Sequence, residues 1–312
     1  MNNFLKSLFG QTKPSADQEN ESAISTAKPM SGAQDITRPL SPHLDSITSI
    51  PPIRADFSQL QASSYQSVGK QRDHNEDALF IMTSMLAGNE RQFPFGIYIV
   101  ADGMGGHQYG EIASEIAALT MAGHLLDQVY RSQIQTNPEP PETPLREILA
   151  EGVIKAHETI LENAPGGGTT LTALLIVDNQ MAIAHVGDSR VYAISKDNTL
   201  HALTRDHSLV KRLEELGQLT ADEAAVHPQK NVLYRALGQG EPFEPEIITA
   251  LAPETGYLLV CSDGLWGLVP ETTLGNIANT TPTLNEACQK MVAAANDAGG
   301  PDNTTALLIR LP

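Results

Sequence analysis

The sequence has 312 residues, of which 41% are hydrophobic and 18% are charged, a composition typical of a soluble globular protein. Twenty basic residues are outnumbered by 37 acidic ones, so the formal net charge is −17, which disfavours binding to nucleic acid or to anionic lipid surfaces. The apolar runs are far shorter than the ~20 residues that cross a bilayer, so we expect no membrane span.

The first 61 residues predict a disordered N-terminal tail rich in Ser, Thr and Pro. They show no sustained apolar period, and with 5 basic and 6 acidic residues they leave nearly all of the net charge to residues 62–312. The opening MNNFLKSLFG is interrupted by Lys6 and no cleavage pattern follows it, so we predict no signal peptide. We expect residues 62–312 to form the folded domain.

Residues 62–312 contain both strand-like and helix-like patterns. Apolar runs that end in turn residues predict strands at 78–82, 96–101, 171–177, 181–186, 191–194, 200–203, 257–261 and 306–311. The four runs between 171 and 203 are separated by turns too short for a parallel crossover, so we expect them to form an antiparallel meander. Helical patterns at 110–130, 145–161 and 284–296 complete an α+β layered fold.

Residues 206–238 interrupt the strand series with a polar, helical pattern. Ser208 is placed to cap a helix that Gly217 ends. We interpret this segment as a flap at the edge of a sheet.

Acidic residues recur where the predicted strands begin or end. The runs IYIVADG, AIAHVGDS and YLLVCSDG each finish in an acid, and the segments NED and PDN place further acids just before strands. The six acids are Glu76, Asp77, Asp102, Asp188, Asp263 and Asp302. A single Asp-Gly pair would most simply be a turn, but six acids in such positions indicate a cluster at one edge of the sheet.

Clustered carboxylates repel one another, so they take up protons or bind cations. Ligands that are all oxygens favour Mg²⁺ or Mn²⁺ over Zn²⁺, and two such ions ~4 Å apart activate water for hydrolysis of a phosphate ester. Arg72 is the nearest cation in sequence and is able to bind phosphate oxygens as a fork, although alone it would be taken for a surface residue. The segment DGMGGH lacks the lysine of a P-loop and does not match GxGxxG, which disfavours nucleotide binding.

The chain resembles a known family, the metal-dependent serine/threonine protein phosphatases of the PP2C (PPM) type, in particular their bacterial branch. The matching motifs follow the family's order over residues 62–312, and they are RDHNED, VADGMGGH, GGTT, HVGDSR, LTRDHS, RALG, CSDGLWG and DNTT. The resemblance implies an αββα sandwich of two antiparallel sheets flanked by helix pairs, with the metal centre at one end of the sheets.

The same resemblance implies a role for each acidic residue. Asp102 matches the carboxylate that bridges two metal ions, and Glu76 with the Gly103 carbonyl completes one site, while Asp263 and Asp302 match the ligands of the other. Asp188, together with Asp263, matches a weaker third site. The expected cofactors are therefore two Mn²⁺ or Mg²⁺ ions and a weaker third ion.

The resemblance also implies the catalytic groups and the reaction. Arg72 matches the phosphate-binding arginine, Asp77 matches the acid that orients metal-bound water, and His107 matches the histidine of the bacterial DGMGGH form. We assign His107 as the general acid, the alternative being that it only orders its loop. Direct attack of a metal-bridging hydroxide on phosphoserine or phosphothreonine is the implied mechanism, and Cys261 lacks the CxxxxxR setting of a cysteine phosphatase.

Two other functions stay open on the sequence: a phosphatase for small phosphorylated metabolites, and a catalytically silent regulatory module with the same fold. The complete set of acids argues against the second. The length of the flap argues against the first, because a long excursion suits a protein segment better than a buried small molecule. Lys211, Arg212 and Lys230 in the flap form a candidate contact surface for phosphorylated segments, the alternative being that they are only solvated helix residues. We expect a monomer that acts on phosphoproteins of a serine/threonine kinase. We also expect a cytoplasmic location, since the only cysteines, Cys261 and Cys288, indicate no disulfide framework.

Overall fold

The computed structural model describes residues 59–87, 92–105, 108–135, 143–240 and 243–312. The predicted tail up to residue 58 and the candidate acid His107 lie outside these ranges. Ser58–Pro312 belong to one compact unit. Among the helices in the described ranges, none is long and apolar enough to span a membrane.

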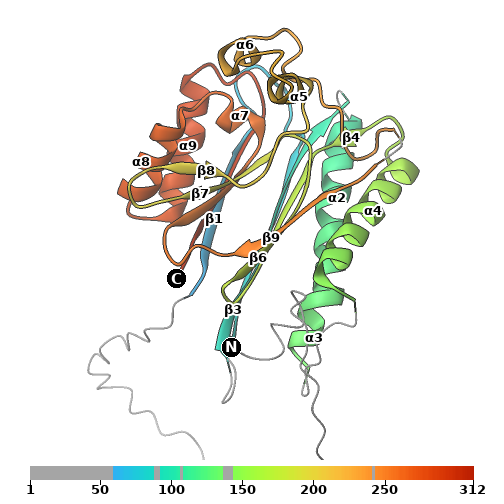
Figure 1. Cartoon of the computed structure of the whole chain (residues 1–312), viewed down its shortest axis with the longest axis vertical. Helices are drawn as coiled ribbons and strands as arrows, with labels where there is room; N and C mark the ends of the chain where they lie inside the picture. Colours follow the sequence, from blue (N-terminus) through green and yellow to red (C-terminus); the bar gives the residue numbers. More distant parts are fainter. Residues whose placement is uncertain (1–58, 88–91, 106–107, 136–142, 241–242) are drawn as a thin grey trace, which may run out of the picture. The chain divides into compact units, whose positions relative to one another are not determined.

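Two antiparallel sheets form the centre of the described part of the chain (Figure 1). The five-stranded sheet has the order β1 (Gln61–Ser67), β11 (Thr304–Arg310), β10 (Tyr257–Cys261), β7 (Arg190–Ile194) and β8 (Leu200–Ala202). The six-stranded sheet has the order β2 (Asp77–Ala87), β3 (Gln92–Met104), β5 (Leu171–Val177), β6 (Gln180–Val186) and β9 (Glu246–Leu251), and the short β4 (Gly168–Thr169) pairs with β3.

Helices cover the outer face of each sheet (Figure 1). The six-stranded sheet is covered by α2 (Gln108–Leu125), which continues through the π-helical turn η1 (Leu126–Tyr130) into α3 (Arg131–Gln133), and by α4 (Leu145–Asn163). The five-stranded sheet is covered by α7 (Asp263–Trp266), α8 (Glu271–Thr280) and α9 (Leu284–Asp297). The expected αββα sandwich is confirmed.

Three buried apolar layers hold the sandwich together. One lies between the two sheets and includes Tyr98, Leu174, Val260 and Leu307. The other two lie between each sheet and its helices. Strands β5 and β6 are buried along their whole length, as expected of strands with apolar layers on both faces.

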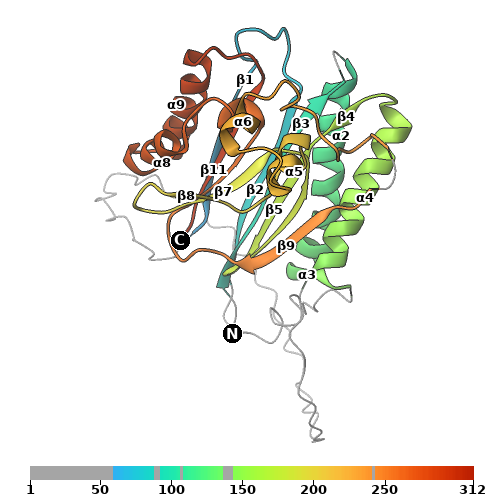
Figure 2. The same ribbon diagram turned by 45° about the horizontal axis from the view of Figure 1, so that its top comes forward.

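The flap contains the short helices α5 (Leu209–Glu215) and α6 (Ala221–Ala225), which lie over one end of both sheets (Figure 2). Ser208 caps α5 as predicted, because its hydroxyl accepts a hydrogen bond from the Lys211 backbone amide. Thr220 and Glu223 form a capping box at α6.

The prediction of a four-strand antiparallel meander is wrong. Strands β5 and β6 pair in the six-stranded sheet, but β7 and β8 pair in the other sheet. A short turn excludes a parallel crossover, but it does not exclude a step from one sheet to the other. Gly187, whose φ of 107° favours glycine, permits this step and leaves Asp188 between the sheets.

Candidate active site

Five of the six carboxylates predicted from strand ends face one cavity of about 200 Å³ at the flap end of the sheets. Its lining includes Arg72, Gly103 and the acids Glu76, Asp102, Asp188, Asp263 and Asp302. These residues come from widely separated parts of the sequence. The structure therefore brings together every predicted metal ligand and the predicted phosphate-binding arginine.

Asp102 lies near the end of β3, where the Gly168–Thr170 segment braces its backbone. Its amide donates a hydrogen bond to the Thr170 hydroxyl at 2.9 Å, and its carbonyl accepts from the Thr170 amide and the Thr169 hydroxyl, each at 2.9 Å. The next residue must be glycine, because a Cβ on Gly103 would overlap the Gly110 carbonyl and approach the Glu76 carbonyl to 2.7 Å.

Asp77 is the first residue of β2 and Glu76 directly precedes it, beside the end of β3. Asp77 pairs with Asp102 across the two strands, and the Gly103 amide donates to the Glu76 carbonyl at 3.1 Å. The Glu76 carboxylate contacts His74 at 3.0 Å. The register of β2 and β3 therefore sets the acids of both strands next to each other.

Asp77 is buried rather than exposed in the cavity. Its Oδ2 accepts hydrogen bonds from the hydroxyls of Thr305 at 2.6 Å and Ser262 at 2.8 Å. Its Oδ1 is buried and has no hydrogen-bond partner among the described residues. This oxygen is available to accept a hydrogen bond from a bound water.

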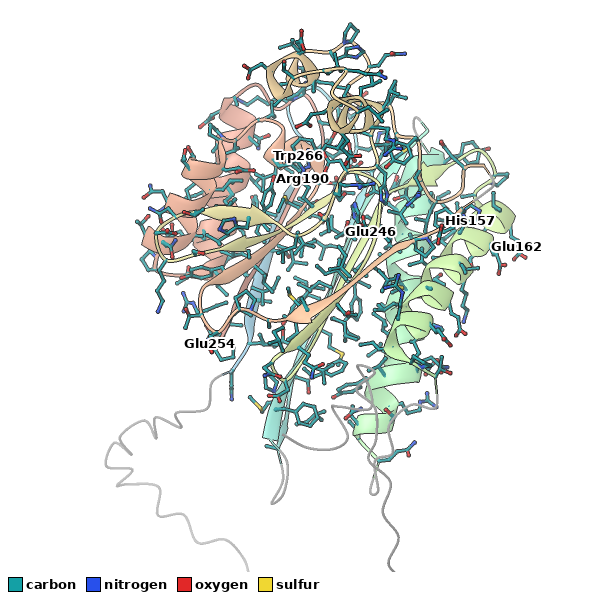
Figure 3. All side chains as sticks on the ribbon, in the orientation of Figure 1. His157, Glu162, Arg190, Glu246, Glu254 and Trp266 are labelled. Atoms are coloured by element: carbon teal, nitrogen blue, oxygen red, sulfur yellow. The ribbon has the colours of Figure 1, made fainter. Side chains whose placement is uncertain are left out.

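Asp188 is held in the turn between β6 and β7 by a side chain from α7. The Trp266 indole donates to the Asp188 carbonyl at 2.9 Å. The Arg190 guanidinium lies 3.4 Å from the centre of the Trp266 ring and forms a fork with Asp206, at 2.8 and 2.6 Å (Figure 3). The start of the flap is thereby tied to Asp188.

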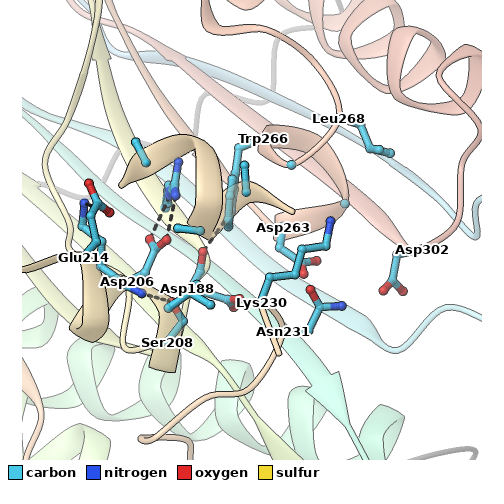
Figure 4. A pocket seen from close by; sticks show the side chains of 18 of the residues that line it. Asp188, Asp206, Ser208, Glu214, Lys230, Asn231, Asp263, Trp266, Leu268 and Asp302 are labelled. Carbon is cyan, nitrogen blue, oxygen red and sulfur yellow. Dashed lines mark hydrogen bonds and ion pairs between the residues drawn. The ribbon is translucent and has the colours of Figure 1, made fainter. Parts of the chain in front are cut away.

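Asp263 and Asp302 approach the cavity from the five-stranded sheet. Asp263 begins α7 directly after β10, and Asp302 precedes β11. Figure 4 shows Asp263 next to Asp188 and Asp302 on the far side of Asp263. Arg72 Nη2 contacts Asp302 Oδ2 at 2.9 Å, and the Arg72 side chain is 49% exposed, so it is able to bind a second anion.

The electrostatics of the cavity favour a cation. Loss of hydration raises the pKa of Asp102 well above its usual range, and repulsion from Asp77 and Asp263 raises it further. Burial, followed by repulsion from Asp263 and Asp206, raises the pKa of Asp188. Burial is also the main cause that raises the pKa of Asp263 to about 6 and that of Asp77 to about 7.

The donor set fits hard divalent cations, because the described side chains that line the cavity offer carboxylate oxygens and neither thiols nor imidazoles. Within the described ranges, no three acidic, histidine or cysteine side chains are close enough together to hold an ion as they stand. The acids instead surround the cavity, so binding an ion requires their side chains to close around it.

Some residues of the site were not assigned a role from sequence. Thr169 and Thr170 brace Asp102, Trp266 holds Asp188, and Asn231 of the flap lines the cavity. The motifs GGTT and CSDGLWG contain the first three, but only tertiary contacts reveal what they touch. His107 lies outside the described residues, so its position relative to the cavity stays a prediction.

The fold and this cavity agree with the comparison with known proteins. The chain belongs to the protein phosphatase 2C family, whose model matches residues 62–304. A serine/threonine phosphatase Stp of Listeria welshimeri is 39% identical over 246 residues, covering 77% of this chain and 92% of the relative. The predicted resemblance is confirmed.

Solved structures of similar fold extend the comparison. The serine/threonine phosphatase of S. agalactiae matches with a TM-score of 0.68 and 33% identity, covering 81% of this chain and 100% of that chain. The catalytic domain of the serine/threonine protein phosphatase PstP, in complex with two manganese ions, matches with a TM-score of 0.63 and 30% identity, covering 81% and 98%.

Proposed function

We propose that this protein phosphatase hydrolyses phosphoserine and phosphothreonine in proteins at the cavity that Asp102 lines. The observation that carries the proposal is the gathering of five carboxylates and Arg72 around one cavity in a chain of the protein phosphatase 2C family. The relatives named serine/threonine phosphatases support the substrate class.

We assign the metal ligands by this arrangement. Asp102 would contact both of two Mn²⁺ or Mg²⁺ ions, with Glu76 and the Gly103 carbonyl on one and Asp263 and Asp302 on the other. Asp188, with Asp263, would hold a weaker third ion. When bound, the cations supply a hydroxide at neutral pH for direct attack on phosphorus and neutralise charge on the phosphoryl oxygens. The two manganese ions in the similar PstP structure support this assignment.

The other residues bind the substrate and orient the reactants. Arg72 holds the phosphoryl oxygens with its exposed guanidinium while Asp302 fixes its position at 2.9 Å. Asp77 orients the attacking water through Oδ1, while Ser262 and Thr305 hold its other oxygen. His107 donates the proton that the departing serine or threonine oxygen requires.

The partners are phosphorylated proteins, the products of a serine/threonine kinase, and we propose that the enzyme acts as a monomer. Cys261 and Cys288 are buried and unpaired, as is usual in a reducing compartment. This supports a cytoplasmic location.

The test is metal-dependent hydrolysis by the full chain. Treatment with EDTA should abolish hydrolysis of a phosphothreonine peptide and of p-nitrophenyl phosphate, and added Mn²⁺ should restore both. Asp263→Asn should lower the restored rate more than tenfold, which corresponds to ~1.4 kcal/mol of barrier. Asp297→Asn, at an exposed position at the end of α9, is the matched control and should retain the rate.

Two outcomes would contradict the proposal. Undiminished activity after thorough chelation would exclude the metal-dependent mechanism. A higher kcat/KM for free phosphothreonine than for the phosphothreonine peptide would make small phosphorylated metabolites the substrate class.

A further inference from the structure

A second cavity, of about 490 Å³, lies between the flap and the proposed metal ligands, and we call it the flap cavity. It shares Asp188, Asn231, Asp263 and Asp302 with the smaller cavity, so the two cavities adjoin. Its volume lies within the about 300–1,000 Å³ typical of ligand sites. If the proposed function holds, a substrate whose phosphoryl group occupies the smaller cavity extends its neighbouring groups into the flap cavity.

The flap cavity is lined by a mixture of charged, polar and apolar side chains, and its apolar side chains come from two walls. Val210 of α5 and Ala224 of α6 belong to the flap wall, and Trp266 and Leu268 belong to the wall at α7. Apolar side chains do not distinguish an acidic neighbour of the phosphorylated residue from a neutral one by charge. Discrimination by charge must therefore come from the charged residues that line the cavity.

Most of these charges are already balanced within the protein. Arg190 forms its fork with Asp206. Lys211 Nζ contacts Glu214 at 3.0 Å, which accounts for a second basic residue of the lining. The three remaining acids of the lining are the proposed metal ligands Asp188, Asp263 and Asp302, whose charge bound cations would neutralise.

Lys230 is the exception. Among the basic residues that line the flap cavity in the described ranges, Lys230 alone has no side-chain hydrogen bond or ion pair. Figure 4 shows its side chain extending from the flap toward Asp263 and Asp302. The next residue, Asn231, lines both cavities, so Lys230 lies where they meet. Arg212, predicted from sequence as part of this surface, pairs with Glu215 and does not line the flap cavity.

We propose that Lys230 binds an anionic group of the substrate adjacent to the phosphorylated residue, either an Asp or Glu carboxylate or a second phosphoryl group. A net charge of −17 repels anionic peptides in general. An unpaired ammonium beside the phosphoryl site gives acidic peptides a local attraction that neutral peptides lack. The preferred substrates are therefore phosphoproteins with acidic or doubly phosphorylated segments.

The test compares matched phosphothreonine peptides with the Mn²⁺-loaded full chain. One peptide has glutamine on both sides of the phosphothreonine, one has glutamate, and one has a second phosphoserine. The wild-type kcat/KM should be about three- to fivefold higher for each anionic peptide than for the neutral one, mainly through KM. Lys230→Ala should bring this ratio to about one, and Lys230→Glu should invert it.

Lys290→Ala is the matched control, because Lys290 is an exposed lysine of α9 that pairs with Glu286 and does not line the flap cavity. It should keep the wild-type ratio. A preference confined to the doubly phosphorylated peptide would identify phosphate as the anion, and a preference for both peptides would identify either anion. A wild-type ratio of one, or a preference that persists in Lys230→Glu, would overturn the proposal. Failure to hydrolyse any of the peptides would overturn the proposed function, and this inference with it.

Discussion

Asp102 combines a strained electrostatic position with a rigid backbone. Hydrogen bonds with Thr169 and Thr170 fix its main chain. The backbone therefore cannot shift to separate the Asp102 carboxylate from its acidic neighbours. Its raised pKa means that ionised Asp102 is less stable in the folded chain than in the unfolded one. The stabilisation that protonation provides is present below the ordinary Asp pKa and is lost as the pH rises through the raised value.

We expect Asp102→Asn to stabilise the metal-free protein at neutral pH while it abolishes turnover. The amide removes the buried charge and its repulsion from Asp77 and Asp263. The melting temperature in EDTA should rise, by about 2–4 °C for each kcal/mol gained, and Mn²⁺-dependent hydrolysis of p-nitrophenyl phosphate should fall more than tenfold. Asp297→Asn makes the same charge change at an exposed position at the end of α9 and should alter neither quantity. A lower melting temperature for Asp102→Asn would show that the carboxylate stabilises the fold.

His185 affects the pH dependence of the free energy of unfolding in the opposite direction to Asp102. Burial lowers its pKa from 6.5 to about 4, and its Nε2 lies 3.1 Å from the Arg205 carbonyl, to which it donates. Below about pH 6.5 the unfolded chain binds a proton at this position and the folded chain does not. The free energy of unfolding therefore decreases as the pH falls from about 6.5 toward 4.

We expect His185→Gln to weaken this dependence. Urea unfolding between pH 7.5 and 5 should give a smaller loss of stability for His185→Gln than for wild type, whereas His201→Gln, at an exposed position of β8, should follow wild type. The acids of the site also bind protons in this pH range, and their protonation stabilises the folded chain. The contribution of His185 is therefore measured as the difference between the wild-type and His185→Gln profiles. Identical pH profiles for wild type and His185→Gln would refute the assignment.

At the scale of elements, sequence patterns locate strands well but do not tell which sheet a strand joins. The runs at 171–177 and 257–261 match β5 and β10 residue for residue. The step from β6 to β7 between the sheets was missed, because turn length limits only the direction of the next strand. Strand β1 was missed because its sequence, QASSYQS, is polar, and pairing with β11 determines it instead.

The site illustrates the same limit. Acids at strand ends and their motifs predicted which residues line the cavity, since side chains that end neighbouring strands share an edge. The roles of Thr170 and Trp266 depend on contacts with residues 68 and 78 positions away, which no local pattern encodes. Lys230 was one of three basic residues singled out in the flap, and its lack of a partner distinguishes it from Lys211 and Arg212.

The brace between the GGTT segment and β3 leads to a prediction about Thr170. Thr170→Val keeps the shape but leaves the Asp102 amide without the acceptor it contacts at 2.9 Å. An unsatisfied buried donor costs about 1–3 kcal/mol of unfolding free energy, and Asp102 should also lose its fixed position. We expect reduced stability in urea together with a lower kcat.

Thr280→Val is the control for this change, because the Thr280 hydroxyl is exposed and bonds only to the Asn276 carbonyl within α8. It should leave both stability and kcat near their wild-type values. If Thr170→Val retained wild-type stability and rate, the brace would have no role in holding Asp102.

At the scale of the whole molecule, the sandwich and its acidic edge depend on pairing between the first and last strands. Seven residues of β1 pair with β11, the strand that follows Asp302. Leu60, just before β1, is 4% exposed and packs in the layer between the sheets. We therefore propose that the phosphatase domain includes Leu60 and starts slightly earlier than residue 62, the start expected from the sequence.

Truncation of the residues before β1 tests where the phosphatase domain starts. A chain that begins at Ser58 retains Leu60 and all of β1, so it should match the full chain in melting temperature and in Mn²⁺-dependent hydrolysis of p-nitrophenyl phosphate. A chain that begins at Val68 lacks β1 and exposes the edge of β11, so it should unfold at a lower temperature or aggregate. Circular dichroism melts of the two truncations beside the full chain measure the difference. The chain from Ser58 keeps every residue that the structure describes. Loss of small-substrate activity in this chain would therefore show that the residues before Ser58 belong to the catalytic domain.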